Sequence, residues 1–413
     1  MREELKKAGL TGLKLLNDAG YEAWWVGGCV RDSLLDRPVD DIDITTSARP
    51  EQIISCFKES GYSVIPTGLK HGTVTVVINK IPLEITVYRS ESEYRDHRHP
   101  SSVFFVEDLK LDCSRRDFTI NALCWHPQTG VKDFFNGQQD LQNRIIRCIG
   151  DPEVRIDEDA LRILRALRFS SVLDFDIDPQ TSAALFAKKN LLKILSAERV
   201  CSEVLKMVTG IRWPQIFLQY HSLLEVLFPL LPALQSPKQI QKTIDLLSRS
   251  SCNTLVRLGC LFVCDKEESF CERQAHQFAC QLKFSNQQKK NLIQLIHHQN
   301  RSLSCDKVCI RQLLHDIPDI AYELVQLQYA CGKLDENQQQ SLLSALQIGM
   351  ENECYSLKQL AVNGNDLKQL HCPARQISTL LNETLDLVIH DRICNNREEL
   401  IEYCRNKIKQ RES

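Results

Sequence analysis

The sequence predicts a mixed α/β domain at the N-terminus followed by an all-helical second half. Strand-like alternation appears in the first part of the chain, at 73–78 (TVTVVI) and 83–88 (LEITVY), together with helical patterns. From about Asp157 onwards, strand signals fade and leucine-rich helical periodicity dominates to the C-terminus. A chain of 413 residues also exceeds what one hydrophobic core usually holds, so about two to four subdomains are expected.

A glycine turn near the N-terminus is the first candidate functional element. The apolar run 24–26 (WWV) predicts a strand, and the segment 27–32 (GGCVRD) follows it directly. Two glycines allow the turn to bring its backbone N–H groups close to an anion. A helix that begins near Val30 favours negative charge at its N-terminus, and Arg31 adds a cation there. The turn therefore predicts a phosphate-sized anion site.

Two aspartates stand a short distance further along the chain. In Asp41-Ile42-Asp43-Ile44, the strand period of two places both carboxylates on one face and both isoleucines on the other, in the core. Such carboxylates share hard cations, and two Mg²⁺ ions about 3.5–4 Å apart suit an in-line displacement at phosphorus. An isolated Asp-x-Asp is usually an exposed strand edge, but its combination with the glycine turn favours a nucleotide and metal site.

The two strands at 73–78 and 83–88 are expected on either side of a turn at 79–82. Glu84 then falls in mid-strand between apolar neighbours. It is either a third carboxylate of the metal site or an exposed residue on the wet face of an edge strand, and the residues alone favour neither. The almost wholly polar segment 90–100 predicts a mobile loop that moves during catalysis.

Two further motifs combine cations with hydrogen-bonding groups. In 115–122 (RRDFTINA), Arg116 suits a phosphate contact, and Asp117 or Asn121 suits hydrogen bonds to hydroxyl groups. This segment could also be an ordinary helix start with a solvated face.

The second motif is 158–169 (EDALRILRALRF), where four charged residues are three apart: Asp159, Arg162, Arg165 and Arg168. On one helix they would fan round the surface and follow an extended ligand from base to triphosphate. Asp159 with Arg162 could read a base edge as a pairing partner would. The alternative is a surface helix with i, i+3 ion pairs, which contributes little to stability.

Composition limits the partners and the compartment. The formal net charge is −2, so binding to a polyanion would depend on local basic surfaces. The 18 cysteines include no Cys-x-x-Cys pair, which indicates reduced thiols and predicts a cytoplasmic protein. No stretch reaches the roughly 20 apolar residues that a membrane helix needs, so no membrane association is expected.

Four motifs together resemble the class II tRNA nucleotidyltransferase and poly(A) polymerase family. They are, in order, 27–32 with Asp41 and Asp43, then 115–122, 158–162 (EDALR) and 196–200 (SAERV). The segment 360–367 (LAVNGNDL) also resembles the C-terminal part of bacterial CCA-adding enzymes, so the likeness covers nearly the whole chain. One departure is Ala374-Arg375, where the family often has glycine.

The resemblance implies a head with the sheet and helices of a DNA polymerase beta-like nucleotidyltransferase, followed by an all-α neck, body and tail. The expected ranges are 1–145 for the catalytic head, 146–210 for the nucleotide-recognising neck, and 211–335 and 336–413 for the tRNA-binding body and tail. The partners implied are the acceptor and TΨC arms of tRNA, bound by shape and backbone, with CTP and ATP as substrates. A monomer and a homodimer are equally compatible with the sequence.

The resemblance also implies a role for each candidate residue. Asp41 and Asp43 would be catalytic and bind Mg²⁺. The incoming nucleotide would be contacted by Gly28, Arg31 and Arg116, its base read by Asp159 and Arg162, and its phosphates or base assisted by Arg165 and Arg168. In this reading the tRNA 3′ hydroxyl attacks the α-phosphate of CTP twice and of ATP once, and pyrophosphate leaves each time.

Rival functions share the same core. The segment 93–100 (EYRDHRHP) resembles the flexible loop of full CCA-adding and A-adding enzymes, which argues against addition of C alone. A-adding and poly(A) polymerase activities remain alternatives. An inactive RNA-binding protein would be expected to lack Asp41 or Asp43. A metal phosphohydrolase is suggested only by His297-His298 and by His315-Asp316, a dipeptide that is common by chance.

Overall fold

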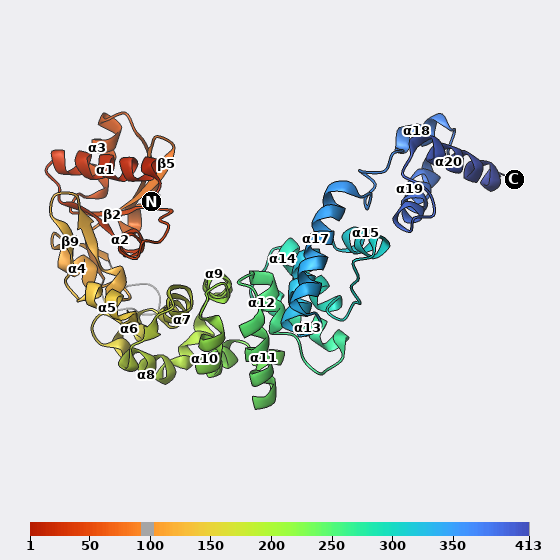
Figure 1. Ribbon diagram of the computed structural model, residues 1–413. Coiled ribbons are helices and arrows are strands. Elements are labelled where there is room, and N and C mark those ends of the chain that lie inside the picture. Colours follow the sequence, from red (N-terminus) through yellow and green to blue (C-terminus); the bar gives the residue numbers. More distant parts are fainter. Residues whose placement is uncertain (92–102, 413) are drawn as a thin grey trace. The chain divides into compact units, whose positions relative to one another are not determined.

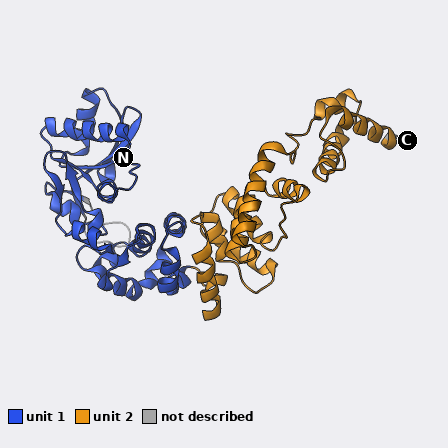
Figure 2. Cartoon of the chain, viewed as in Figure 1, with its two compact units in different colours: residues 1–227 blue, residues 228–413 orange. Residues whose placement is uncertain are grey.

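The computed structural model describes residues 1–91 and 103–412 and separates into two compact units, Met1–Leu227 and Phe228–Ser413 (Figure 2). The first unit holds a mixed sheet with helices, and the second unit is helical over its described residues. The predicted fold class, an α/β head followed by helices, is therefore confirmed. One small exception is the two-residue strand at 176–177, which lies after Asp157 and pairs with the strand at 145–146.

A seven-stranded sheet forms the head, in the order β3-β4-β5-β2-β1-β8-β9. Only β2 and β5 run parallel, and the other neighbours are antiparallel. The strands are β1 (Ala23–Val26), β2 (Asp43–Thr46), β3 (Ser63–Gly68), β4 (Thr73–Ile78), β5 (Ile81–Val87), β8 (Cys124–His126) and β9 (Gly130–Lys132). Two-stranded pairs are formed by β6 (Arg89–Glu91) with β7 (Val103–Phe105), and by β10 (Ile145–Ile146) with β11 (Asp176–Ile177).

Helices α1 (Glu3–Asp18) and α3 (Pro50–Glu59) lie together beside the sheet (Figure 1). Helix α1 packs closely on β2 and the residues before it, because a Cβ at Gly9 would lie 2.7 Å from Ile42 Cδ1 and one at Gly12 would lie 2.9 Å from Ile44 Cδ1. Both isoleucines are fully buried. Since side chains alternate along a strand, their burial turns the neighbouring aspartates to the opposite face.

The hairpin between β4 and β5 is tighter than the sequence suggests. Only Asn79 and Lys80 form the turn, both with positive φ, and Ile81 already pairs with Ile78. A two-residue turn with two left-handed residues matches the twist of the flanking strands. Strand β5 also lies inside the sheet, between β4 and β2, so the reading of Glu84 as part of an edge strand is wrong.

The remaining helices of the first unit carry the chain from the head into an all-helical segment. They are α2 (Gly28–Leu34), α4 (Leu109–Ser114), α5 (Gly137–Asn143), α6 (Pro152–Glu158), α7 (Leu161–Leu173), α8 (Pro179–Ala187), α9 (Ala197–Val208) and α10 (Trp213–Leu227). Short 3₁₀ turns occur at Leu69–His71, Thr119–Asn121 and Lys189–Ile194. Helices α7 and α9 pack against each other, and their contact positions charged side chains of the site described below.

Gly210 fixes the close approach of the chain after α9 to the end of α7. A Cβ there would lie 2.3 Å from Ser171 Oγ and 2.4 Å from its carbonyl oxygen, so backbone would have to move. We expect Gly210→Ala to lower the free energy of unfolding of this unit by about 2–4 kcal/mol. Denaturant unfolding followed by tryptophan fluorescence measures it, since all four tryptophans lie in this unit. A loss below about 0.5 kcal/mol would contradict the prediction, because it would mean that the chain after α9 relaxes away from Ser171 at little cost.

The second unit consists of helices joined by short connections. They are α11 (Pro237–Arg249), α12 (Thr254–Cys260), α13 (Glu268–Gln281), α14 (Asn286–His297), α15 (Lys307–Asp316), α16 (Ala321–Ala330), α17 (Glu336–Asn352), α18 (Gly364–Gln369), α19 (Ala374–Ile389) and α20 (Arg397–Glu412), with a 3₁₀ turn at Pro232–Leu234. The buried Arg311 ties α15 to the later helices, because it pairs with Glu353 at 2.6 Å and Asp391 at 2.5 Å.

Candidate active site

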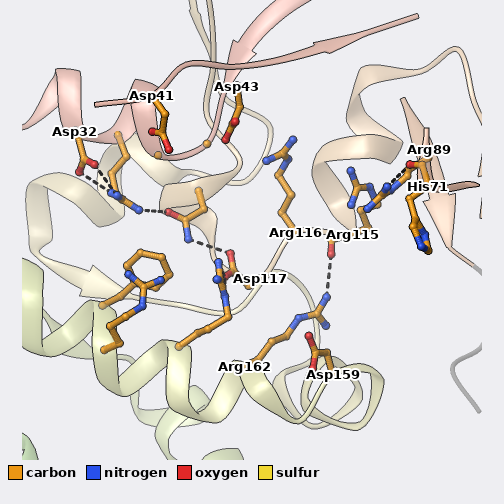
Figure 3. A pocket seen from close by; sticks show the side chains of 17 residues that line it. Asp32, Asp41, Asp43, His71, Arg89, Arg115, Arg116, Asp117, Asp159 and Arg162 are labelled. Atoms are coloured by element: carbon orange, nitrogen blue, oxygen red, sulfur yellow. Dashed lines mark hydrogen bonds and ion pairs between the residues drawn. The ribbon is translucent and has the colours of Figure 1, made fainter. Parts of the chain in front are cut away.

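One cavity of about 560 Å³ in the first unit gathers nearly all the candidate residues (Figure 3). Asp41 and Asp43 lie on one side of it, and Asp159 and Arg162 lie on the opposite, helical side. Its lining consists of Gly27, Gly28, Arg31, Asp32, Asp41, Asp43, His71, Arg89, Arg115, Arg116, Asp117, Asn121, Asp159, Arg162, Arg165, Arg168 and Phe169. Of the predicted site residues, Glu84 alone is missing from this lining.

The two aspartates of the Asp-x-Asp motif lie at the start of β2. The strand begins only at Asp43, so Asp41 is in the preceding segment and is exposed, yet both carboxylates line the cavity. The pKa of Asp43 is raised to about 6, first by burial and then by the negative charge of Asp41, while Arg116 opposes the shift. Two carboxylates that repel each other in a partly buried place are a donor set that suits a hard cation.

Glu84 is the neighbour of Asp43 on the adjacent strand. The two residues are Cα partners in the parallel pairing of β2 and β5, and the charge of Glu84 also raises the pKa of Asp43. The side chain itself is exposed. In the described ranges 1–91 and 103–412, no three His, Cys, Asp or Glu side chains converge as a ligand set, so the three carboxylates do not converge in this structure.

Protonation of Asp43 makes stability depend on pH. Its pKa is about 6 in the folded chain against 3.8 ordinarily, so the folded state binds more protons between these values and stability falls as pH rises. We expect Asp43→Asn, in EDTA, to raise the melting temperature of the first unit by a few degrees at pH 7.5, and to have no effect near pH 4. Melting curves followed by tryptophan fluorescence across pH 4–8 measure this, and an equal effect at both ends would contradict it.

The glycine turn leads from β1 directly into α2. Gly27 has φ +79°, a conformation that side chains rarely adopt, and a Cβ there would also lie 3.3 Å from Arg116 Nη1. Arg31 is buried and held by Asp32, to which its Nε and Nη2 donate at 2.9 and 2.7 Å. Its Nη1 donates to Asn121 Oδ1 at 2.6 Å. The turn and the cation are thus held rigidly at the cavity wall.

Asp117 links the head to helix α7. Its carboxylate accepts from Arg165 Nε at 2.7 Å and from Asn121 Nδ2 at 3.0 Å. Although burial opposes it, the charge of Arg165 and these hydrogen bonds lower the pKa of Asp117 to about 2. Asp117 therefore stays ionised and acts as an acceptor in the cavity.

The charged motif at 158–169 does not form one continuous helix, contrary to the prediction. Helix α6 ends at Glu158, Asp159 is extended (φ −140°, ψ 102°), and α7 begins at Leu161. Asp159 is therefore not on the helix of the three arginines. Arg162 also does not lie on the surface, since it is buried, with its Nη1 2.6 Å from Glu158 Oε2 and its Nη2 2.9 Å from the Arg115 carbonyl oxygen.

Several residues that shape the cavity were not predicted. Arg199, within the motif at 196–200, donates to Asp159 at 2.7 Å and fixes its direction. Glu203 is buried on α9 and accepts from Arg168 Nε at 2.5 Å. Phe169 has three guanidinium groups against its ring, those of Arg31, Arg165 and Arg168, at 4.9, 5.3 and 3.8 Å from its centre. Arg199 and Phe169 lie within the motifs 196–200 and 158–169, whereas Glu203 had no signal of its own.

Other predicted features lie apart from this cavity. The segment 93–100, the expected flexible loop, falls outside the described residues. Ser90 and Glu91, at the start of the predicted polar loop, still belong to strand β6. In the second unit, His315 Nδ1 contacts the Tyr355 carbonyl oxygen at 2.9 Å, and Asp316 pairs with Arg301. None of the described helices is long and apolar enough to cross a membrane.

Comparison with protein families gives three matches along the chain. The poly A polymerase head domain matches residues 23–147. The probable RNA and SrmB-binding site of polymerase A matches 174–234, and the putative domain 2 of tRNA nucleotidyltransferase matches 267–404. Three of the four sequence motifs lie in the first two of these ranges, and 158–162 falls in the gap between them.

Individual proteins are similar over longer stretches. A CCA-adding enzyme of Staphylococcus epidermidis is 35% identical over 409 residues, 95% of each chain. One of Lactobacillus helveticus is 50% identical over 205 residues, 50% of each chain. Among solved structures, the CCA-adding enzyme of Bacillus stearothermophilus in complex with CTP has a TM-score of 0.78 at 27% identity and covers 100% of this chain and 99% of its own.

Proposed function

This chain belongs to the family of CCA-adding enzymes, which are nucleotidyltransferases, and on that premise we propose that it adds and repairs the 3′-terminal CCA of tRNA. The tRNA 3′ hydroxyl attacks the α-phosphate of CTP twice and of ATP once, without a nucleic-acid template, and releases pyrophosphate each time. The observation that supports this best is a single cavity in which the Asp41 and Asp43 carboxylates face seven arginines from the head and the neighbouring helices.

Asp41 and Asp43 are the proposed catalytic residues. Their carboxylate oxygens are ligands of the kind that Mg²⁺ prefers, and the raised pKa of Asp43 fits a site that a cation would complete. When bound there, Mg²⁺ supplies activation of the attacking hydroxyl and charge stabilisation for the leaving oxyanion. Glu84, the strand partner of Asp43, is the candidate for a third carboxylate.

The nucleotide is proposed to lie between the glycine turn and α7. Gly28 allows close approach of the backbone, while Arg31 and Arg116 contact the triphosphate, assisted by Arg165 and Arg168. Asp117, which stays ionised, and Asn121 are the proposed partners of the ribose hydroxyls.

Asp159 and Arg162 are the proposed readers of the base. A carboxylate accepts from the exocyclic amino group that cytosine and adenine share, and a guanidinium donates to ring nitrogen or carbonyl oxygen. Each is held by another side chain, Asp159 by Arg199 and Arg162 by Glu158, so both are oriented before a nucleotide arrives.

The rest of the chain is proposed to hold the tRNA. In this assignment 1–145 is the catalytic head, 146–210 the neck, and 211–335 and 336–413 are the body and tail that bind the acceptor and TΨC arms. Recognition there is by shape and backbone, through local basic surfaces on a chain of net charge −2. We place the protein in the cytoplasm, where tRNA is processed, as a monomer or homodimer.

Three tRNA substrates, ending at the discriminator base, at C and at CC, test this function. Each is given to the purified protein with Mg²⁺ and CTP alone, ATP alone or both. Two additions with CTP, one with ATP on the CC end, and a stop after CCA are expected. Addition of A to the CC end only would instead make it an A-adding enzyme, long A tails on generic RNA a poly(A) polymerase, and no transfer an inactive RNA-binding protein.

A further inference from the structure

Asp112, on helix α4, is a fully buried carboxylate behind the cavity wall. Its Oδ1 accepts from Arg115 Nε and Nη2 at 2.9 and 2.8 Å and from the Arg89 backbone N–H at 3.3 Å. Its Oδ2 accepts from Thr45 Oγ1 at 3.1 Å and Arg116 Nη2 at 3.4 Å. A buried ionised carboxylate is costly unless such donors surround it, so the cluster forms only when these elements are together.

The cluster connects the cavity cations to the strand of the catalytic aspartates. Thr45 follows Asp43 by two residues on β2, so their side chains share a face of the sheet. Arg115 and Arg116, which also pair with Asp112, line the cavity, whereas Asp112 and Thr45 do not. Among the described residues, Arg116 Nε is buried without a hydrogen-bond partner, and Asp112 is the carboxylate that pairs with Nη2 of the same guanidinium. Burial would raise the pKa of Asp112, but the charges of Arg115 and Arg116 and the hydrogen bonds outweigh it and lower the pKa, so the carboxyl stays ionised.

We propose that Asp112 is a positioning residue for nucleotide binding: it holds the Arg116 guanidinium at the cavity wall in register with Asp43, through Thr45. It does not touch the nucleotide and acts through the cavity cations that it holds, Arg116 and its neighbour Arg115. The role rests on the proposed function, in which Arg116 contacts the triphosphate of either nucleotide. Loss of the Asp112 charge should therefore weaken the binding of CTP and of ATP by the same factor and leave the preference between the two nucleotides unchanged.

The decisive measurement is the dissociation constant for CTP and for ATP, by calorimetry without tRNA, supported by KM and kcat for transfer. For Asp112→Asn, we expect both dissociation constants and KM values to rise about tenfold or more, with kcat little changed. Arg116→Ala should have a similar effect. The double variant should bind less weakly than the two single effects added together, because part of the effect of Asp112→Asn passes through Arg116.

Thr45 offers a matched pair that does not depend on how well Asp112→Asn folds. Thr45→Val keeps the shape and removes the hydroxyl donor to Asp112, whereas Thr45→Ser keeps the hydroxyl. We expect weaker CTP and ATP binding in the first, by about threefold, and binding like the unaltered protein in the second. Equal binding by both variants would overturn the positioning role, and so would additive effects of Asp112→Asn and Arg116→Ala.

Asp178→Asn is the control for a buried ion pair as such. Asp178 is buried, accepts from Arg147 Nη1 at 2.5 Å and is not part of the cavity lining. Asp178→Asn should lower the melting temperature without changing the dissociation constant for CTP. If Asp112→Asn has the same effect and no more, the role of Asp112 is only structural. If the unaltered protein binds CTP but transfers no nucleotide, the proposed function is overturned. The role of Asp112 is still decided in that case, because the dissociation constants are measured without transfer.

Discussion

Replacement of Asp43 by asparagine is expected to lower the rate of nucleotide transfer by about 10⁴-fold or more, in the presence of saturating CTP and Mg²⁺. Asparagine keeps the size of the side chain but removes the charge that would hold a cation beside the reacting phosphate. Single-turnover transfer of CMP to a tRNA that ends at the discriminator base measures the effect.

The control for this variant stands three residues before it. Asp40 is exposed and does not line the cavity, so Asp40→Asn makes the same chemical change outside the site and should retain nearly full activity. Unfolding will not explain the loss, since Asp43→Asn is expected to stabilise the first unit at neutral pH. Activity within tenfold of the unaltered protein would show that Asp43 is not a metal ligand in the reaction.

Arg162→Ala is expected to have the second-largest effect, on the choice of nucleotide as well as on rate. The variant loses the donors proposed to read the base, together with the hydrogen bonds to Glu158 and to the Arg115 carbonyl oxygen. We expect kcat/KM for CTP and ATP to fall by about 10²–10³-fold, and the preference of CTP over UTP to shrink by about tenfold or more.

Arg155→Ala is the matched control for this second variant. Arg155 donates to the same carboxylate of Glu158 at 2.8 Å, but it does not line the cavity. It should cost some stability and leave the preference of CTP over UTP as it was. If the two variants change nucleotide preference equally, the effect comes from Glu158 and its surroundings, and Arg162 does not read the base.

Much of the fold follows from local patterns. Strand β4 coincides with the alternating run 73–78, and the leucine-rich periodicity after Asp157 is almost entirely helical in the described residues. Chain breaks inside a charged helical pattern were harder to foresee. The extended Asp159 between α6 and α7 is held by Arg199, 40 residues away, and no local spacing records such a partner.

By itself the sequence pointed to side chains that line one cavity, and to the face on which Asp41 and Asp43 stand. The alternation of Asp41 and Asp43 with buried isoleucines, and the glycines before Arg31, depend only on periods of two and on backbone freedom, which are local properties. Only the tertiary structure decided how these groups are held. Asp117 with Arg165 and Asp112 with Thr45 are 48 and 67 residues apart, and they pair because packing of the helices against the sheet buries charges that must then find partners.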